Sequence, residues 1–330
     1  KAVFVVGQAV RQKKVRFGSR GFTLIAVGAW PFNDSAPLKV AEQLIAENTN
    51  ILQSPLPADS ALILMPLPGV TTSDRWTAET RGSTVVLLMG TDARRNVALS
   101  RLQVVLAHEL FHLWVPNALK LQGDYDWFFE GFTVYQALLT ALRLRYIKFQ
   151  DYLETLSRVY DSYRSSTERD KLSLLEGSER RWTTASSVVY DRGVLVAFIY
   201  DLMTRQQSAS RATISDVYDR GVLVAFIYDL MRRRQSGTGE TISAVYPEVW
   251  RTASGQDGNE VLMAILNRHG MEGFSEKFVQ SSSEIDLKSL LPSYGLELQT
   301  VGSNSQMRVS NTITAEQRRL LKTLGYKGKS

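Results

Sequence analysis

Two of the three histidines in this 330-residue chain, His108 and His112, stand four positions apart, with Glu109 beside the first of them. On a helix, positions i and i+4 lie about 40° apart around the axis and about 6 Å apart along it. Both imidazoles therefore leave the same face and can bind one metal ion, while the carboxylate can reach a water molecule on that ion. The pattern predicts a zinc site, with one zinc per chain, two nitrogen ligands and a general base.

The residues around this HExxH motif are mostly apolar. Residues 102–114 form an apolar run with helical character. Burying two imidazoles and a carboxylate in such a run costs free energy unless they have partners, and a metal ion would satisfy all three. The motif also occurs by chance in ordinary amphipathic helices, but its apolar setting here favours the metal site.

Glu130 is the candidate for the third protein ligand that a catalytic zinc needs. It stands at the start of a second helical run, for which Asp126 is a plausible cap. Pro116 ends the first helix and Gly123 lies in the connection, so we expect the two helices to fold back as an antiparallel pair. The alternative is that Glu130 is only an acid near a helix N-terminus. Its aromatic neighbours make a solvated helix end the weaker interpretation.

The chain at this point resembles a known family. The segments HELFHLW and WFFEGFTVY are similar to those of the gluzincin metallopeptidases, and most similar to the M61 glycyl aminopeptidases, relatives of the aminopeptidase N (M1) group. The resemblance implies that His108, His112 and Glu130 are the zinc ligands and that Glu109 is the general base. Seventeen residues separate His112 from Glu130, where eighteen is commoner, and the difference falls in a loop.

A third segment, SVVYDRGVL at residues 187–195, is similar to the family's Y-x-K-G segment, with arginine in place of lysine. The resemblance implies that Tyr190 donates a hydrogen bond to the oxyanion of the tetrahedral intermediate. A preorganised hydroxyl next to a metal suits that task on chemical grounds as well. The alternative is a half-buried core tyrosine at the start of a helix.

A tandem repeat contains this tyrosine. The fifteen residues VYDRGVLVAFIYDLM at 189–203 recur without change at 217–231, an offset of 28 residues. Perfect identity exceeds what a shared fold requires, so we interpret spans 189–216 and 217–244 as a recent duplication or a sequence error. Tyr218 then competes with Tyr190 for the same role. The separation from Glu130 favours Tyr190.

The N-terminal third contains short apolar runs that predict strands at 2–6, 23–27, 61–65 and 84–89, with a helix over 40–50. The family resemblance implies a mixed sheet whose edge strand lines the substrate cleft. The segment at 77–84 lies where the family has its GGLEHRNS-like segment, so Glu79 is expected to hold the free amine of a substrate. Trp76 and Thr77 replace the glycines and Thr80 replaces the histidine. An ordinary surface glutamate therefore remains the alternative.

The expected fold class is α+β, a thermolysin-like (gluzincin) catalytic domain. Residues 1–95 would form its mixed-sheet part, residues 96–298 its helical zinc-binding part, and residues 299–330 a C-terminal tail, without the PDZ domain that the family usually carries. Helical spacing is clearest over 149–163 and 260–280. The third histidine, His269, is expected to cap a helix end rather than bind metal.

Composition narrows the chemistry further. The chain has no cysteine, which leaves histidine and carboxylate as metal ligands. Its net charge of +6 comes from scattered residues, so no nucleic-acid partner is expected. No apolar run reaches membrane-spanning length. We expect an extracytoplasmic bacterial enzyme, periplasmic or secreted, and leave a cytoplasmic one open, as we do the oligomeric state.

These observations predict a zinc-dependent metallopeptidase that acts on peptide or protein substrates, with an aminopeptidase favoured. Two alternatives stay open. One is a zinc endopeptidase that does not recognise an N-terminal amine. The other is a catalytically impaired, peptide-binding homologue whose cleft is spoiled by the 28-residue repeat.

Overall fold

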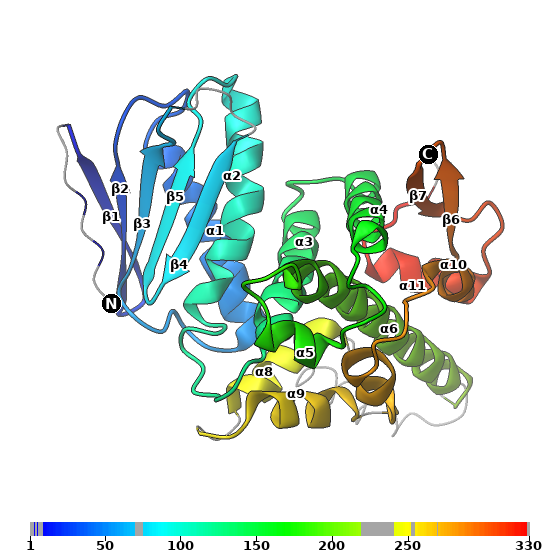
Figure 1. Ribbon diagram of the computed structural model, residues 1–330. Coiled ribbons are helices and arrows are strands. Elements are labelled where there is room, and N and C mark those ends of the chain that lie inside the picture. The colour runs from blue at the N-terminus through cyan, green and yellow to red at the C-terminus, as the bar shows by residue number, and fades with distance from the viewer. Residues whose placement is uncertain are drawn as a thin grey trace. The chain divides into compact units, whose positions relative to one another are not determined.

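The computed structural model describes residues 3, 5, 9–69, 75–218, 241–251, 255–268 and 270–328, with the backbone alone for 209–218 (Figure 1). The chain divides into two compact units. Unit 1 comprises Lys1–Gly123, Gln136–Ile147 and Trp250–Asp257, and unit 2 comprises Asp124–Tyr135, Lys148–Val249 and Gly258–Ser330. We describe each unit by itself.

Unit 1 is built on a five-stranded mixed sheet. Its strands are β1 (Arg11–Phe17), β2 (Arg20–Ala26), β3 (Ser60–Pro66), β4 (Trp76–Arg81) and β5 (Thr84–Met89), and its helices are α1 (Ser35–Leu52), α2 (Arg95–Glu109), the 3-10 turn η1 (Phe111–Leu113) and most of α3 (Thr133–Arg143). The strand order is β1-β2-β3-β5-β4. The inner pairs β2–β3 and β3–β5 are parallel, and the outer pairs β1–β2 and β4–β5 are antiparallel.

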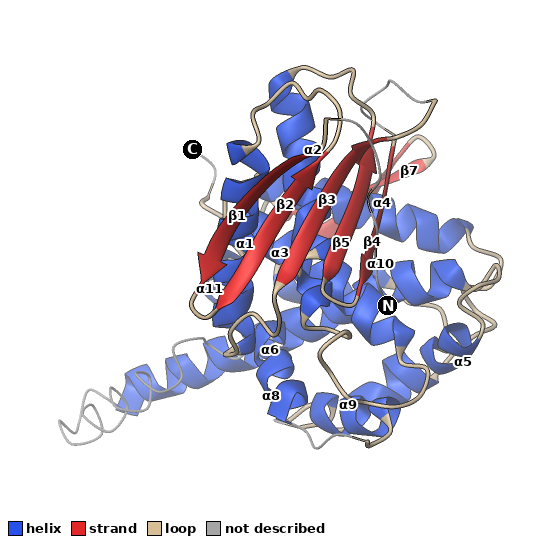
Figure 2. Ribbon diagram, turned by 90° about the vertical axis from the view of Figure 1, so that its left-hand side faces the viewer, coloured by secondary structure: helices blue, strands red, loops and turns tan. Residues whose placement is uncertain are grey.

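One face of this sheet packs against α1 and α2, as Figures 1 and 2 show. Alternate residues along the strands are buried, as the period of two in a half-covered strand requires. The buried strand residues include Phe22, Leu24, Leu62, Leu64, Val85 and Leu87. The helix residues buried with them include Ala41, Leu44, Leu102 and Leu106. The core of unit 1 therefore lies between the sheet and the two helices, and it fixes β4 next to α2.

The sequence prediction of a mixed sheet is confirmed. The predicted strands at 23–27, 61–65 and 84–89 correspond to β2, β3 and β5, and the predicted helix at 40–50 lies within α1. The predicted strand at 2–6 falls mostly outside the described residues. Strand β1 was not predicted because its sequence RQKKVRF is rich in charge. Charged residues are common on such edge strands, where they discourage pairing with another chain.

Unit 2 is mainly helical. It contains two π-helical segments, η2 (Trp127–Phe132) and η3 (Val188–Arg192). Along the chain, α3 follows η2 and α6 (Gly193–Tyr218) follows η3. The other elements of unit 2 are α4 (Phe149–Ser165), α5 (Leu174–Glu179), η4 (Ile242–Ala244), most of α8 (Val245–Arg251), α9 (Gly258–Leu266), η5 (Glu276–Gln280), α10 (Leu287–Leu290), η6 (Leu291–Tyr294), β6 (Leu296–Val301), β7 (Asn304–Val309) and α11 (Ala315–Thr323). Strands β6 and β7 pair as an antiparallel hairpin.

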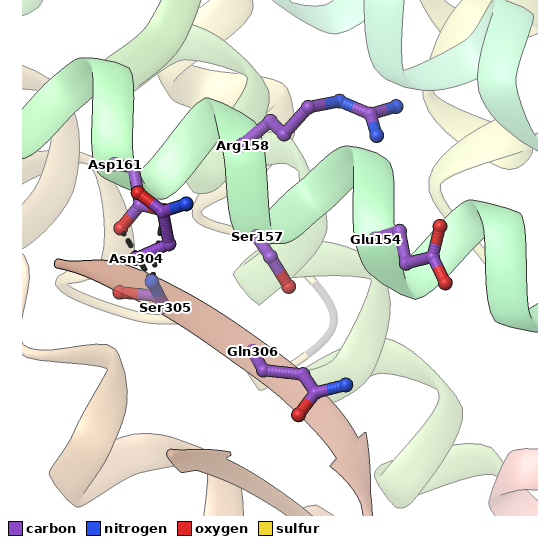
Figure 3. Close-up of a pocket in the computed structure, with 7 residues that line it drawn as sticks. All are labelled: Glu154, Ser157, Arg158, Asp161, Asn304, Ser305 and Gln306. Atoms are coloured by element: carbon purple, nitrogen blue, oxygen red, sulfur yellow. Dashed lines mark hydrogen bonds between the residues drawn. The ribbon is translucent and has the colours of Figure 1, made fainter. Parts of the chain in front are cut away.

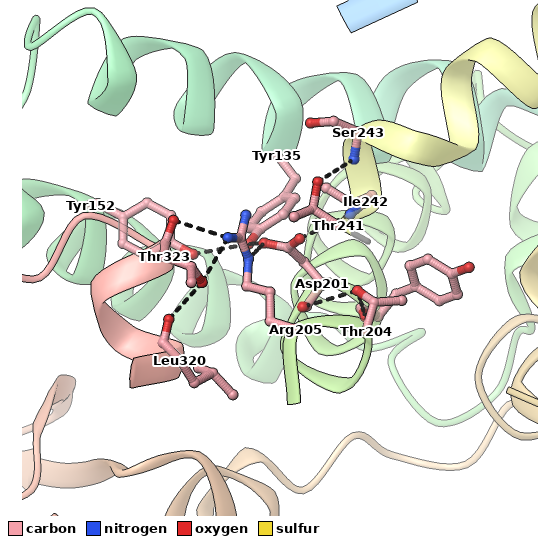
Figure 4. A network of polar contacts seen from close by, with 11 residues as sticks. Tyr135, Tyr152, Asp201, Thr204, Arg205, Thr241, Ile242, Ser243, Leu320 and Thr323 are labelled. Atoms are coloured by element: carbon pink, nitrogen blue, oxygen red, sulfur yellow. Dashed lines mark hydrogen bonds and ion pairs between the residues drawn. The ribbon is translucent and has the colours of Figure 1, made fainter. Parts of the chain in front are cut away.

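A buried polar network joins α6 to other parts of unit 2 (Figure 4). Asp201, with no exposed surface, accepts hydrogen bonds from Arg205 at 2.8 Å, from Tyr135 at 2.9 Å and from the backbone N–H of Ile242 at 2.9 Å. Arg205 in turn donates to the backbone oxygen of Thr323, at the end of α11. Because each charged group has partners, the network can be buried without a large desolvation cost.

The helix predicted over 149–163 is found as α4, and the range 260–280 contains two separate helical segments, α9 and η5. Helix α5 was not predicted within the polar segment 165–181. Residues 299–330, predicted as a tail, contain most of the hairpin and α11. His269 and most of the second repeat copy lie outside the described residues. The predicted boundaries after residues 95 and 298 stay a prediction.

In the part of the chain that the structure describes, none of the helices combines the length and the apolar character needed to cross a lipid bilayer.

Candidate metal centre

The two histidines of unit 1 lie where one kind of helix gives way to another. Helix α2 ends at Glu109, and the tighter turn η1 begins at Phe111. The motif is therefore not held on one continuous α-helix, as the sequence suggested. Pro116 gives the physical reason, because the residue before a proline is disfavoured in α-helical geometry and the chain tightens as it approaches that point. The predicted result survives, since the Nε2 atoms of His108 and His112 are 2.9 Å apart.

The backbone sets the protonation of His112. Its Nδ1 lies 2.7 Å from the backbone oxygen of Val115. A carbonyl oxygen only accepts, so Nδ1 carries the hydrogen, and in a neutral imidazole Nε2 then carries a lone pair. This is the tautomer that a metal ligand needs, fixed by a hydrogen bond from the far side of the ring.

The spacing of the two rings also suits zinc. Nitrogen ligands lie about 2.0–2.1 Å from zinc, so two of them in tetrahedral geometry are about 3.3–3.4 Å apart. The observed separation of the Nε2 atoms, 2.9 Å, is only slightly shorter. His112 is buried, which keeps competing water from its ring. The two imidazoles are thus arranged to bind a single ion with little movement.

Glu109 is buried, and Thr80 on the edge strand β4 contacts it twice. The Oγ1 atom of Thr80 is 2.7 Å from Oε2 of Glu109 and 2.8 Å from its backbone oxygen. The hydroxyl therefore both orients the carboxylate and meets a carbonyl at the end of α2, where helical carbonyls lack partners within the helix. Sequence reasoning did not select Thr80, because only the packing of β4 on α2 brings it there.

Glu79 lies on the other side of the same strand. Adjacent residues of a strand point to opposite faces, so Glu79 points away from the face on which Thr80 meets Glu109. Its carboxylate is 2.7 Å from the guanidinium of Arg81, and both side chains are more than half exposed. Within unit 1 the structure thus brings Thr80 to the general base and does not bring Glu79 there. The predicted role of Glu79 as an amine anchor stays a prediction.

Glu130 of unit 2 lies in the π-helical segment η2 and is buried. Its Oε1 accepts a hydrogen bond from Arg181 at 2.5 Å. Asp126 precedes η2, but its side chain makes no cap hydrogen bond, which corrects the predicted capping role. The carboxylate of Asp126 instead accepts from the same Arg181 at 2.6 Å. A hydrogen bond from a charged guanidinium is stronger than one from the backbone N–H groups at a helix end, so Asp126 pairs with Arg181.

Tyr190 lies in the second π-helical segment, η3, which packs against η2. Its hydroxyl oxygen is 3.0 Å from the guanidinium of Arg181. Burial and the nearby negative charge of Glu130 raise the pKa of Tyr190 well above its ordinary value, so the phenol keeps its hydrogen. A neutral, half-buried hydroxyl is suited to donating a hydrogen bond to a developing negative charge.

The repeat gives Tyr218 a different place. Helix α6 runs without a break from Gly193 to Tyr218. The start of this helix lies next to Tyr190. At 1.5 Å per residue, the backbone of Tyr218 lies about 38 Å along the helix from that start. The side chain of Tyr218 lies outside the described residues. Of the two candidates, Tyr190 is therefore the one for which the structure describes a contact with Arg181, the partner of Glu130.

The arginine that replaces lysine in the Y-x-K-G pattern is a structural residue here. Arg192 has no exposed surface, and its guanidinium donates to the backbone oxygens of Arg169, at 3.2 Å, and Ser281. Burial lowers its pKa from the ordinary value. These contacts hold two loops of unit 2 against η3, the segment that carries Tyr190.

Among the described residues, His108 and His112 of unit 1 and Glu130 of unit 2 are candidate metal ligands. Two imidazole nitrogens and one carboxylate oxygen are the donor set found in catalytic zinc sites of the His₂Glu type. Softer thiolate ligands play no part, because the chain has no cysteine. The residues present therefore fit zinc.

A separate hollow of about 300 Å³ lies in unit 2 between α4 and β7 (Figure 3). Seven residues line it: Glu154, Ser157, Arg158, Asp161, Asn304, Ser305 and Gln306. Both carboxylate oxygens of Asp161 accept from the backbone N–H of Ser305, at 3.0 and 2.9 Å. This aspartate therefore serves to hold β7 on α4.

Comparisons with known proteins agree with the motifs. The model of the M61 glycyl aminopeptidase family matches residues 101–224, which contain both halves of the candidate site. No curated protein matches the chain. Among solved structures, the aminopeptidase N family protein of Idiomarina loihiensis is similar, with a TM-score of 0.64 and 16% identity over 88% of this chain and 50% of that one.

A second similar structure is a variant of the M1 zinc metallopeptidase of Deinococcus radiodurans, bound to a Tyr-Ser-Ala substrate. Its TM-score is 0.54, with 15% identity over 84% of this chain and 53% of that one. The chain thus spans about half the length of these solved structures. At identities this low, the structural similarity shows a common fold and nothing more. The predicted resemblance is confirmed: the chain matches the M61 glycyl aminopeptidases over residues 101–224 and has a mixed sheet and a helical region like those of the M1 aminopeptidase fold.

Proposed function

We propose that this protein is a zinc metallopeptidase of the gluzincin type that hydrolyses peptide bonds, with a thermolysin-like arrangement of its catalytic residues. His108, His112 and Glu130 bind one zinc ion. The observation that carries the proposal is the pair of Nε2 atoms 2.9 Å apart, one of them on a ring whose tautomer the backbone fixes for metal binding. The match of residues 101–224 to a peptidase family supports it.

The proposed mechanism assigns one task to each residue. Zinc, when bound, acts as a Lewis acid toward the substrate carbonyl and the attacking water. Glu109 accepts a proton from that water as it attacks the scissile carbonyl, and then passes the proton to the leaving amine. Tyr190 donates a hydrogen bond to the carbonyl oxygen as negative charge develops on it. Thr80 holds the carboxylate of Glu109 through its hydroxyl.

An aminopeptidase is the first candidate within this class, because the matching family is that of the M61 glycyl aminopeptidases and the similar structure from Idiomarina loihiensis is an aminopeptidase N family protein. Recognition of a free amine needs an anion near the end of the cleft, and Glu79 was the candidate. Its pairing with Arg81 on the exposed face of β4 favours an endopeptidase as the second candidate. The third possibility, a peptide-binding protein without activity, would follow if the repeat disturbs the cleft.

The test is metal analysis followed by hydrolysis assays. The purified protein is expected to hold about one zinc per chain and to hydrolyse peptide reporters. Reporters with free and with blocked amines separate the two peptidase classes, since an aminopeptidase cleaves only the former. A protein that carries zinc and binds peptides but cleaves neither reporter would support the binding protein. Absence of zinc after purification without chelators would overturn the proposal.

A further inference from the structure

Arg181 contacts three oxygen atoms of unit 2, and two of them belong to Glu130 and Tyr190, to which we have assigned roles. Its Nη1 donates to Oδ1 of Asp126 at 2.6 Å, and its Nη2 donates to Oε1 of Glu130 at 2.5 Å and to the hydroxyl of Tyr190 at 3.0 Å. It lies beyond α5, 51 positions from Glu130 in the sequence. One side chain thus links a candidate metal ligand to a candidate oxyanion donor.

The charges of this cluster make the link strong. The side chain of Arg181 is 16% exposed, and those of Asp126 and Glu130 are 15% and 8% exposed. Ion pairs sheltered from water in this way are screened little by salt. A guanidinium also stays charged and presents several N–H groups in one plane, which a lysine cannot do. The neighbouring carboxylates outweigh burial and raise the pKa of Arg181.

Aromatic rings hold the guanidinium in place. Its Cζ lies 4.7 Å from the ring centroid of Trp182, 5.4 Å from that of Phe129 and 5.8 Å from that of Tyr190. Cations over aromatic faces are attracted by the ring electrons. The plane of Arg181, and with it the directions of its N–H groups, is therefore set by packing as well as by charge.

The hydrogen bonds of Tyr190 tie it both to Arg181 and to Glu130. The phenol oxygen accepts from Arg181, and the phenol's own hydrogen is directed at the carboxylate of Glu130, a hydrogen bond that contributes to the raised pKa of Tyr190. The carboxylate of Glu130 is likewise held in one orientation, because its Oε1 accepts from Arg181.

We propose that Arg181 is a positioning residue, which orients Glu130 for the metal ion and Tyr190 for the substrate oxygen. This inference rests on the proposed function and deepens it. Arg181 acts through these two side chains and takes no proton in the reaction.

The test compares R181A and R181K with R180A, a matched control at the neighbouring arginine, which is exposed. Zinc affinity is measured by competition with a chelator of known affinity. Outer partners of metal ligands typically contribute 10- to 100-fold in affinity, so R181A is expected to bind zinc that much more weakly. R180A is expected to stay within about twofold, and R181K to recover only part of the loss, because its point charge cannot bridge three oxygens.

Kinetics give a second, independent reading. At saturating zinc, R181A is expected to lower kcat for a peptide reporter while KM changes little. The double variant R181A/Y190F is expected to lose less than the product of the two single losses, because both act on the same hydroxyl. Thermal unfolding of the metal-free variants separates a merely structural role, which would lower the midpoint and leave zinc affinity and the kcat-to-KM pattern as in R180A.

The outcomes separate the two proposals. If the unaltered protein binds zinc and cleaves peptides, and R181A matches R180A in zinc affinity and kcat, the positioning role is wrong and the proposed function stands. If the unaltered protein neither binds zinc nor cleaves peptides, the proposed function itself fails. Should R181A not fold, R181K carries the comparison, and full zinc affinity with full kcat in R181K would overturn the inference.

Discussion

Gly131 and Gly193 face each other where the two π-helical segments of unit 2 meet. A Cβ atom on Gly131 would lie 2.5 Å from the Cα of Gly193, and one on Gly193 would lie 2.9 Å from the Cα of Gly131. Each glycine is close in sequence to a candidate site residue, Glu130 on one side and Tyr190 on the other. The close approach of the two backbones explains why the EGF and YDRG sequences both need glycine at these places.

Substituting alanine at either glycine is therefore expected to destabilise unit 2. The new methyl group meets backbone atoms, which cannot turn aside as a side chain can, and overpacking of this kind costs about 1–3 kcal/mol. G131A and G193A are expected to lower the free energy of unfolding in denaturant titrations and to weaken zinc binding. G177A is the control, because its Cβ would meet a side chain, that of Val188, at 3.0 Å. Equal stability of all three variants would contradict the backbone contact.

Glu109→Gln is expected to abolish hydrolysis while zinc remains bound. The amide keeps the shape of the carboxylate but cannot accept a proton, and loss of a general base lowers kcat by about 10²- to 10⁴-fold. The measurement is kcat on a peptide reporter beside zinc content by metal analysis. Retained activity in E109Q with full zinc would show that another group takes the proton.

Thr80→Val is expected to lower kcat by about 10- to 100-fold, because the carboxylate of Glu109 loses the hydroxyl that orients it. Valine has nearly the shape of threonine, so packing of β4 on α2 is preserved. Thr80→Ser keeps the hydroxyl and is expected to retain most of the activity. Since Glu109 is not a metal ligand in the proposed site, zinc affinity is expected to be unchanged in both variants. A fall in kcat of equal size in both would point to packing instead.

The two copies of the repeat give an internal control for the oxyanion role. Tyr190→Phe is expected to lower kcat by about 10²- to 10³-fold, the typical effect of removing one donor to an oxyanion. Tyr218→Phe makes the same change in the same local sequence and is expected to leave kcat unaltered. If the two variants exchange these effects, the second copy serves the site.

Zinc is expected to stabilise the folded chain. A ligand that binds only the native state at about 100 times its Kd contributes about 2.7 kcal/mol. Differential scanning calorimetry should therefore show a higher unfolding midpoint with zinc than after chelation. In His112→Ala, the added zinc is expected to have little effect on the midpoint. An equal shift in H112A would place the bound ion elsewhere.

The local parts of this fold follow from the sequence. Alternating and continuous apolar runs predicted β2, β3 and β5, and helical spacing predicted α1 and α4, because each pattern reports which face of one element is buried. Strand β1 and helix α5 were not predicted. Strand β1 is charged along most of its length, and α5 is short and lies in a polar segment, so neither shows the burial on which such predictions depend.

The candidate site divides in the same way. His108, His112 and Glu109 could be selected from the sequence alone, since residues four apart share a face whenever the chain is helical or nearly so. Thr80 and Arg181 carry no such local signal. They lie 29 and 51 positions from Glu109 and Glu130 respectively, and only the packing of β4 on α2 and of the α5 region on η2 brings them into contact. The sequence by itself thus determined the two candidate histidine ligands and the candidate general base, because helical geometry is local. The tertiary structure decided which side chains orient them, because that depends on contacts between distant segments.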